Sequence, residues 1–146
     1  MIKELILKNR SYRRFDESVK ISPETLTELV ELAQFSATGS NMQPLKFITC
    51  CNPEKNGQIF STLTWAGYLK DWDGPQPGEQ PTAYVIILGD KEIKNNFGVD
   101  PGIAAQSILL GAVDKGLGGC MLGSIKRDEL RSMLAISEQF DILLVI

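Results

Sequence analysis

Residues 101–124 read PGIAAQSILLGAVDKGLGGCMLGS, and the rest of the chain can be interpreted outward from this stretch. From Gly102 to Lys115 the apolar side chains go almost all the way round a helix, whereas a surface helix would show a polar face. We therefore predict a helix buried in a core or an interface, too short to span a membrane. Lys115 followed by Gly116 is typical of a helix C-terminus.

The glycine-rich sequence after this helix, Leu117 to Gly123, predicts a strand with very little side-chain bulk. Glycine in a strand often marks close approach by another backbone or by a ligand. Tight packing of helix on strand and a ligand-binding turn both fit this pattern. The dinucleotide fingerprint does not fit, because Met121 stands where its third glycine would be, and the Gly-Lys-Ser/Thr ending of a P-loop is absent.

Length and composition indicate one ordinary globular domain over residues 1–146. Hydrophobic residues make up 43% and charged residues 23% of the chain, both usual values. The formal net charge of -3 gives no general electrostatic reason to bind nucleic acid or an acidic membrane. We see no signal peptide and no transmembrane run, so we expect a cytoplasmic protein.

The chain has no histidine, and this absence excludes several classes of active site. Neither a Ser-His-Asp triad, nor a Cys-His pair, nor a histidine-ligated metal can be built from it. Cys50, Cys51 and Cys120 offer neither a disulfide framework nor zinc-site spacing, and we predict that they are reduced and mostly buried. If the protein is an enzyme, a bound organic cofactor is a natural source of its chemistry.

A cluster of arginines lies near the N-terminus, in the sequence NRSYRRFD over residues 9–16. Arg10, Arg13 and Arg14, with Ser11 among them, are suitable donors to the oxygens of a phosphate. The alternative is a solvated basic patch, or arginines paired with nearby acidic residues. The arginines alone leave both explanations open.

A second polar cluster follows a predicted helix that starts at Ser22-Pro23-Glu24, a strong helix N-terminus. The cluster reads FSATGSNMQP over residues 35–44. Asn41 and Gln43 each offer an amide donor and an acceptor, which suits recognition of the edge of a heterocycle. Ordinary turn chemistry explains the same composition.

The remaining elements alternate without a regular strand–helix–strand rhythm, which favours an α+β fold. We predict strands at 46–51, 83–88 and 142–146, and helices at 2–8, from Pro53, at 91–98 and at 127–134. Residues 71–82 form a loop rich in Pro and Gly, and such loops are often functional. The aromatic residues Trp65, Tyr68 and Trp72 either line a pocket above a planar ligand or anchor that loop. Because the chain stops inside an apolar strand, we expect a truncated C-terminal end.

Taken together, three blocks resemble the FMN-dependent nitroreductase family, and the resemblance covers essentially the whole chain. The blocks are RSYRRF at 10–15, TGSNMQP at 38–44 and GLGGCMLG at 116–123. The resemblance implies a central mixed, mostly antiparallel sheet flanked by helices. It also implies an obligate homodimer with two FMN molecules at the subunit interface.

The family likeness also implies roles for particular residues. Arg10, Ser11 and Arg13 would hold the flavin phosphate and part of the ring, and Asn41 and Gln43 would reach the flavin from the other subunit. The backbone of Met121, Leu122 and Gly123 would lie along the reactive edge of the flavin. No protein group is implied as a nucleophile. NAD(P)H would reduce the flavin, and the flavin would reduce a nitroaromatic, quinone or similar acceptor in ping-pong fashion.

This sequence departs from the family pattern in two places. Asn9 stands where the family usually has a basic residue. The family chain also continues past the last strand, to supply a Lys or Arg to the phosphate and an arm to the partner. Three alternatives remain: a different flavin chemistry such as dehalogenation, flavin cleavage or azoline oxidation, a non-enzymatic FMN carrier or redox sensor, and an interaction module without a cofactor.

Overall fold

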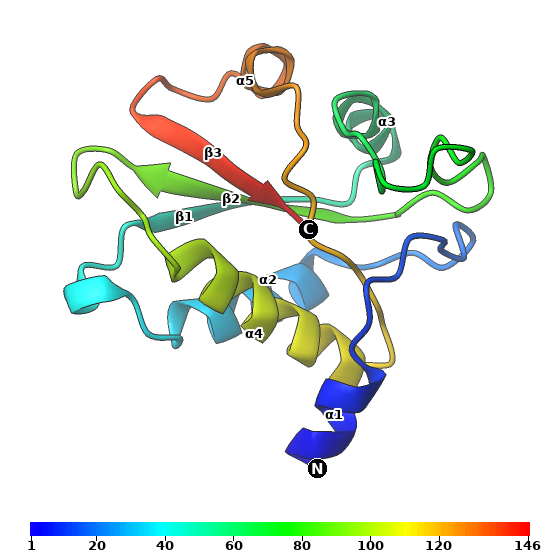
Figure 1. The fold of residues 1–146 in the computed structure, drawn as a ribbon, viewed down its shortest axis with the longest axis horizontal. Coiled ribbons are helices and arrows are strands. Elements are labelled where there is room, and N and C mark those ends of the chain that lie inside the picture. Colours follow the sequence, from blue (N-terminus) through cyan, green and yellow to red (C-terminus); the bar gives the residue numbers. More distant parts are fainter.

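A three-stranded sheet lies between two pairs of helices in the computed structural model, which describes residues 1–146 (Figure 1). The strands β1 (Leu45–Cys50), β2 (Tyr84–Asp90) and β3 (Phe140–Val145) pair in that order, both times antiparallel. One face carries α2 (Pro23–Gln34) and α4 (Asp100–Asp114), and the other carries α3 (Pro53–Ser61) and α5 (Arg127–Leu134). The predicted α+β fold is confirmed.

The central strand β2 is buried along its whole length, since helices cover both of its faces. Successive side chains of a strand point to opposite faces. Tyr84, Ile86 and Leu88 accordingly belong to the core beside α3 and α5, and Val85 and Ile87 to the core beside α2 and α4. The continuous apolar run that predicted this strand therefore reflects burial on two sides.

The helix α4 confirms the prediction made from residues 102–115. Ala104, Ala105, Ile108 and Ala112 are buried, in one core with residues of α2. Gly116, with φ of 74°, ends the helix in a Schellman turn. Its N–H donates to the carbonyl of Val113 at 3.0 Å, and the next N–H donates to that of Ala112 at 2.8 Å.

The glycine-rich stretch after α4 is not the strand that we predicted. It makes only isolated bridges, a parallel one between Ser11 and Gly119 and an antiparallel one between Leu122 and Val145. Because these partners belong to different segments, no continuous ladder of hydrogen bonds forms. The stretch is an extended connection, held at two points.

The helix predicted over residues 91–98 is also wrong, because these residues form turns. The Asp90 carboxylate accepts a hydrogen bond from the N–H of Glu92 at 3.0 Å, and the Asn96 side chain accepts one from the N–H of Gly98 at 3.0 Å. Short polar side chains that bond to nearby backbone compete with helix formation in this way.

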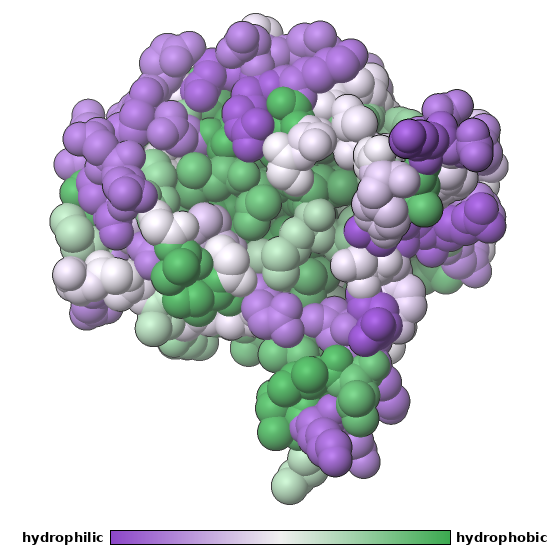
Figure 2. All heavy atoms as spheres, viewed as in Figure 1, coloured by the Kyte–Doolittle hydropathy of each residue, from purple (hydrophilic) through white to green (hydrophobic).

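The N-terminal helix α1 (Ile2–Lys8) projects from the body and has no buried residue (Figure 1). Ile2, Ile6 and Leu7 are 61%, 52% and 64% exposed. The projecting end of the molecule at the bottom of Figure 2, where α1 lies, shows apolar surface to the solvent. The helix therefore leaves an apolar surface uncovered in the single chain. No helix of the protein combines the length and the apolar character needed to cross a bilayer.

Candidate functional site

The segment Arg10–Arg14, called the arginine segment below, lies on the glycine-rich stretch after α4. The N–H of Tyr12 donates to the carbonyl of Gly119 at 3.0 Å. A Cβ added at Gly118 would lie only 2.5 Å from the Tyr12 ring. The small residues after α4 therefore allow the arginine segment to approach closely, which is the tight packing that the sequence left open.

An open groove, the arginine groove, separates this segment from residues 68–72. Its volume is about 810 Å³, and Ser11–Arg14 and Tyr68–Trp72 line it. The Arg13 guanidinium lies 5.7 Å from the centre of the Tyr68 ring, and that of Arg14 lies 5.9 Å from the Trp72 ring. The groove therefore combines positive charge with flat aromatic faces.

The aromatic residues 65, 68 and 72 do not share one role. Trp65 is 4% exposed and packs edge-on against Phe15, with 6.4 Å between ring centres, so it anchors the loop that follows. Tyr68 is 71% exposed and, with Trp72, lines the groove. The sequence suggested that these aromatic residues line a pocket above a planar ligand or anchor the loop. It gave no signal that Tyr68 and Trp72 lie beside the arginines.

The loop over residues 73–82 is tied to the chain just after the arginine segment. The Glu17 carboxylate accepts hydrogen bonds from the N–H groups of Gly78 at 2.5 Å and Gln80 at 3.3 Å. The N–H of Phe15 donates to the carbonyl of Glu79 at 2.9 Å. These contacts fix the two sides of the groove relative to each other.

The residues 121–123 lie in the same extended connection as Gly119. Leu122 is 6% exposed, and its N–H and carbonyl pair with Val145 at 2.8 and 3.0 Å. This N–H is therefore already used, which narrows the role that the family likeness gave to Leu122. Met121 and Gly123 are exposed on either side of it, and the N–H of Gly123 has no acceptor in the chain.

The other predicted polar cluster, Thr38–Gln43, is called the amide loop below, and it includes the short helix η1 (Gly39–Asn41). Asn41 and Gln43 are exposed, and the Gln43 amide nitrogen donates to the Asn41 side-chain oxygen at 3.0 Å. Ser40, Asn41 and Gln43 have φ of 52°, 51° and 51°. This conformation is uncommon outside glycine, so the loop is strained.

The structure does not bring the amide loop to the arginine groove. The loop contacts the start of α4, where the N–H of Gly39 donates to the Asp100 carboxylate at 2.8 Å. The arginine segment contacts Gly119, beyond the end of α4 (Figure 1). A helix of 15 residues is about 22 Å long, so the two groups of predicted site residues lie at opposite ends of α4.

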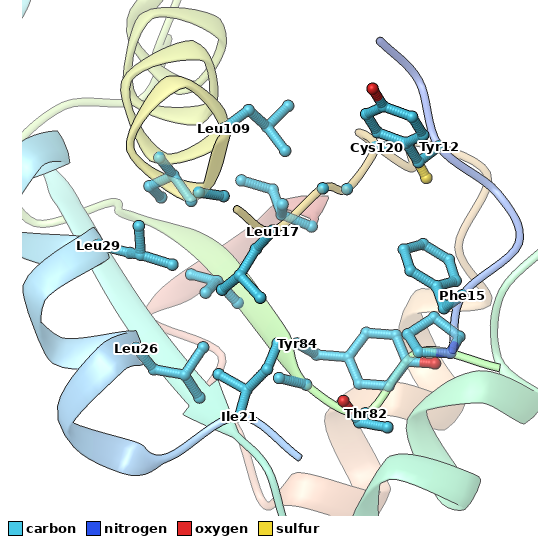
Figure 3. Close-up of a pocket in the computed structure, with 18 of the residues that line it drawn as sticks. Tyr12, Phe15, Ile21, Leu26, Leu29, Thr82, Tyr84, Leu109, Leu117 and Cys120 are labelled. Carbon is cyan, nitrogen blue, oxygen red and sulfur yellow. The ribbon is translucent and has the colours of Figure 1, made fainter. Parts of the chain in front are cut away.

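An apolar cavity of about 400 Å³ lies behind the arginine segment (Figure 3). Tyr12 and Phe15 line one side, Leu26 and Leu29 of α2 the other, and Leu109 of α4 lies above them. The cavity separates the arginine segment from the core of α2 and α4.

Two titratable groups in the wall of this cavity are held neutral. Burial raises the pKa of the Cys120 thiol to about 11, an effect that the Arg13 charge partly offsets. Burial also raises the pKa of the Tyr84 hydroxyl, and its oxygen has no hydrogen-bond partner in the chain. Because the thiolate is the nucleophilic form of cysteine, Cys120 is unsuited to nucleophilic catalysis at neutral pH.

Comparisons with known proteins place this arrangement in a family. The model of the Nitroreductase family matches residues 6–146. The FMN reductase (NADPH) of Bacillus subtilis is 26% identical over 137 residues, which cover 86% of this chain and 55% of the relative. The chain thus spans about half the length of that relative.

Solved structures show the same fold. A nitroreductase family protein from Clostridium novyi superposes with a TM-score of 0.82 at 18% identity, covering 99% of this chain and 82% of the other. An FMN-dependent nitroreductase from Clostridium difficile superposes with a TM-score of 0.78 at 22% identity, covering 97% and 82%. Because the family model covers the arginine segment, the amide loop and the glycine-rich stretch in one match, the chain belongs to the nitroreductase family.

Proposed function

We propose that this chain binds FMN and uses NAD(P)H to reduce nitroaromatic, quinone or similar acceptors in ping-pong fashion. Family membership and the named activity of the Bacillus subtilis relative support a flavin oxidoreductase. The observation that carries the proposal is the arginine groove, because it places the guanidinium groups of Arg13 and Arg14 and the rings of Tyr68 and Trp72 around one opening.

The groups that line the groove, together with Arg10 next to it in the sequence, fit the two ends of FMN. Arg10 is exposed and has no carboxylate within ion-pair distance, so with the Ser11 hydroxyl it can bind a phosphate. Tyr68 and Trp72 offer flat faces to a planar ring. Arg13, which already lies over Tyr68, is suited to the electron-rich pyrimidine side of the ring.

We further propose that a second copy of the chain completes each flavin site. Asn41 and Gln43 lie about one helix length from the groove in their own chain, so Asn41 and Gln43 of the partner subunit would reach this flavin. The uncovered apolar side chains of α1 give a second reason for a dimer, since such surfaces usually mark an interface.

Bound FMN would supply the hydride chemistry, and the protein would supply binding and electrostatics. The charge of Arg13 would favour negative charge on the adjacent ring, and the free N–H of Gly123 would donate a hydrogen bond to the edge of the ring. Tyr68 and Trp72 would keep water away from the ring faces. No protein nucleophile is required, which agrees with the raised pKa of Cys120.

The visible spectrum of the purified protein tests the cofactor, and Arg10→Ala tests its placement. We expect a flavin spectrum in the unaltered protein and FMN binding about 10- to 100-fold weaker in Arg10→Ala, because a hydrogen bond to a charged group contributes about 1.5–3 kcal/mol. Lys46→Ala, which removes an exposed charge on β1, is the matched control. Unchanged FMN affinity in Arg10→Ala would refute the placement.

Turnover distinguishes the proposed enzyme from an FMN carrier or redox sensor. Under anaerobic conditions NADH or NADPH should bleach the flavin absorbance, and a quinone or nitroarene should restore it over many cycles. A flavin that NADH and NADPH both leave oxidised would instead indicate the non-enzymatic alternative.

A further inference from the structure

The most deeply buried carboxylate of the protein belongs to Asp100, which is 2% exposed in the first turn of α4. One carboxylate oxygen accepts the N–H of Gly39 at 2.8 Å, and the other lies 3.5 Å from the Lys94 ammonium. A buried charge is costly unless it is paired and hydrogen-bonded, and Asp100 meets both conditions. Its backbone partner is the amide loop, 61 residues earlier in the chain.

The amide loop is the part of the chain that needs such an anchor. Ser40, Asn41 and Gln43 all have φ near 50°, where a side chain crowds its own backbone. Strained conformations of this kind persist only when the surroundings hold them. Within the loop, the N–H of Gln43 donates to the Thr38 hydroxyl, and the N–H groups of Asn41 and Met42 donate to the carbonyls of Thr38 and Gly39. The bond from Gly39 to Asp100 is the one that ties this strained turn to the rest of the protein.

A role confined to the helix explains the position of Asp100 but not its contacts. An acidic residue in the first turn of a helix interacts favourably with the helix dipole wherever its side chain points. The Asp100 carboxylate, however, accepts no hydrogen bond from the N–H groups of its own helix and accepts instead from Gly39 and Lys94. The geometry therefore links the start of α4 to the amide loop.

We infer that Asp100 is a positioning residue for flavin binding. Through the N–H of Gly39 its carboxylate holds the amide loop in the strained form that presents Asn41 and Gln43 to the flavin of the partner subunit. Lys94 keeps the buried carboxylate paired. This inference rests on the proposed function, since it requires Asn41 and Gln43 to contact FMN.

Two substitutions break the same hydrogen bond from opposite sides. Asp100→Ala removes the acceptor, and Gly39→Pro removes the donor while leaving α4 unaltered. Proline suits the backbone there, because Gly39 is the first residue of η1 and the preceding Thr38 is extended, with ψ of 155°. Its ring Cδ takes the place of the hydrogen that Gly39 donates over 2.8 Å, so the ring also pushes the loop away from the Asp100 carboxylate. Gly39→Ala keeps the N–H and is the matched control. Its new Cβ would lie 3.2 Å from Nζ of Lys94, at the flexible end of that side chain, and at ordinary contact distance, 3.6 Å, from the Asp100 carboxylate.

The experiment measures the dissociation constant of FMN by flavin fluorescence, with circular dichroism as a check of folding. We expect FMN binding about tenfold weaker in Asp100→Ala and in Gly39→Pro, and no additional loss in the double variant, because both remove one interaction. Asp100→Asn, which keeps a side-chain oxygen acceptor, should bind FMN more tightly than Asp100→Ala. Gly39→Ala should stay within threefold of the unaltered protein.

Each outcome separates this inference from the proposed function. If the unaltered protein binds no FMN, the proposed function fails. If it binds FMN and folded Gly39→Pro binds equally well, the positioning role of Asp100 is overturned and the proposed function stands. Additive losses in the double variant would also overturn it, because they would show two separate effects. If Asp100→Ala does not fold, the comparison of Gly39→Pro with Gly39→Ala still decides the question.

Discussion

The flavin site that we propose has two halves, or half-sites, which lie at the two ends of α4 and differ in kind. The arginine segment offers charged donors on regular backbone that rests on glycines, and the chain beneath it makes ordinary backbone hydrogen bonds. The amide loop offers neutral groups on strained backbone, anchored by a buried carboxylate. A charge attracts a phosphate over a range of directions, whereas an amide group must be correctly oriented to form its hydrogen bonds. In the amide loop this orientation depends on strained backbone and on the hydrogen bond to Asp100.

Both ends also use a carboxylate to hold a loop by its backbone N–H groups, but under different conditions. Asp100 is 2% exposed and paired with Lys94. Glu17, which holds Gly78 and Gln80, is only partly buried and has no ion-pair partner. Partly solvated contacts open more easily than buried ones, so we expect faster amide hydrogen exchange at Gly78 and Gln80 than at Gly39.

The largest expected effect comes from separating the half-sites onto different chains. We expect neither Arg10→Ala nor an Asn41→Ala/Gln43→Ala double variant to bind FMN well. A mixed dimer of the two should regain one intact site, because that site takes its arginines from one chain and its amides from the other. Mixing the variants under conditions that exchange subunits, then measuring flavin absorbance, tests this.

The same mixture also contains its own control. The second site of each mixed dimer carries both defects, so at random exchange only about a quarter of all sites should recover. Recovery of none, with subunit exchange verified by differently tagged chains, would show that both half-sites serve a flavin within one chain. The comparison between the two ends of α4 would then lose its functional meaning.

The next largest effect comes from a matched pair of glycine substitutions, one at each end of α4. We expect one of them to lower stability and FMN binding and the other to change both quantities little. In Gly118→Ala the new Cβ would lie 2.5 Å from the Tyr12 ring, so the arginine segment must shift. We expect a loss of about 1–3 kcal/mol in the free energy of unfolding and weaker FMN binding. Gly39→Ala meets only a flexible lysine end and should change both quantities little. Urea unfolding measures the stability of both variants, and titration with FMN measures their affinity. Equal losses of stability and affinity in the two variants would contradict the expected difference between the two ends of α4.

The helix α4 was predictable from the sequence, whereas the structures of residues 91–98 before it and residues 117–123 after it were not. Its apolar side chains and Gly116 are local signals, and the structure confirms both. The stretch 117–123 failed as a strand because a strand needs one continuous partner, and its partners, residues 11 and 145, are far away in the sequence. The turns at 91–98 depend on side chains of Asp90 and Asn96 that compete with helix formation.

The site was predictable where its chemistry is carried by local composition. Arginines with a serine, and amides in a loop, can be recognised within a few residues. The loop that follows Tyr68 and Trp72 is held by Glu17, whose carboxylate accepts the N–H of Gly78, 61 residues away. The anchor at Asp100 depends on another contact over 61 residues. Such contacts leave no periodic signal in the sequence, so only the structure reveals them.

The smallest expected effect at neutral pH concerns Cys120, which follows the glycines beneath the arginine segment. Its pKa is about 11, against an ordinary value of 9.0, so as the pH rises the thiol loses its proton in the unfolded chain first. The associated stability is therefore complete below about pH 9 and is lost between about pH 9 and 11, up to about 3 kcal/mol. Urea unfolding of the unaltered protein and of Cys120→Ala across that range should show a smaller loss in the variant.

The same raised pKa predicts which thiols react at pH 8. There only about 0.1% of Cys120 is thiolate, so iodoacetamide should leave it unmodified and leave FMN binding unchanged. Cys51, which directly follows β1 and is half-buried, should be modified first. Modification of Cys120 at pH 8 in the folded protein, detected by peptide mass spectrometry, would contradict this expectation. It would mean that the glycine-rich backbone beneath the arginine segment opens often enough to expose the thiol, because a thiol held neutral by burial reacts only when its cover opens.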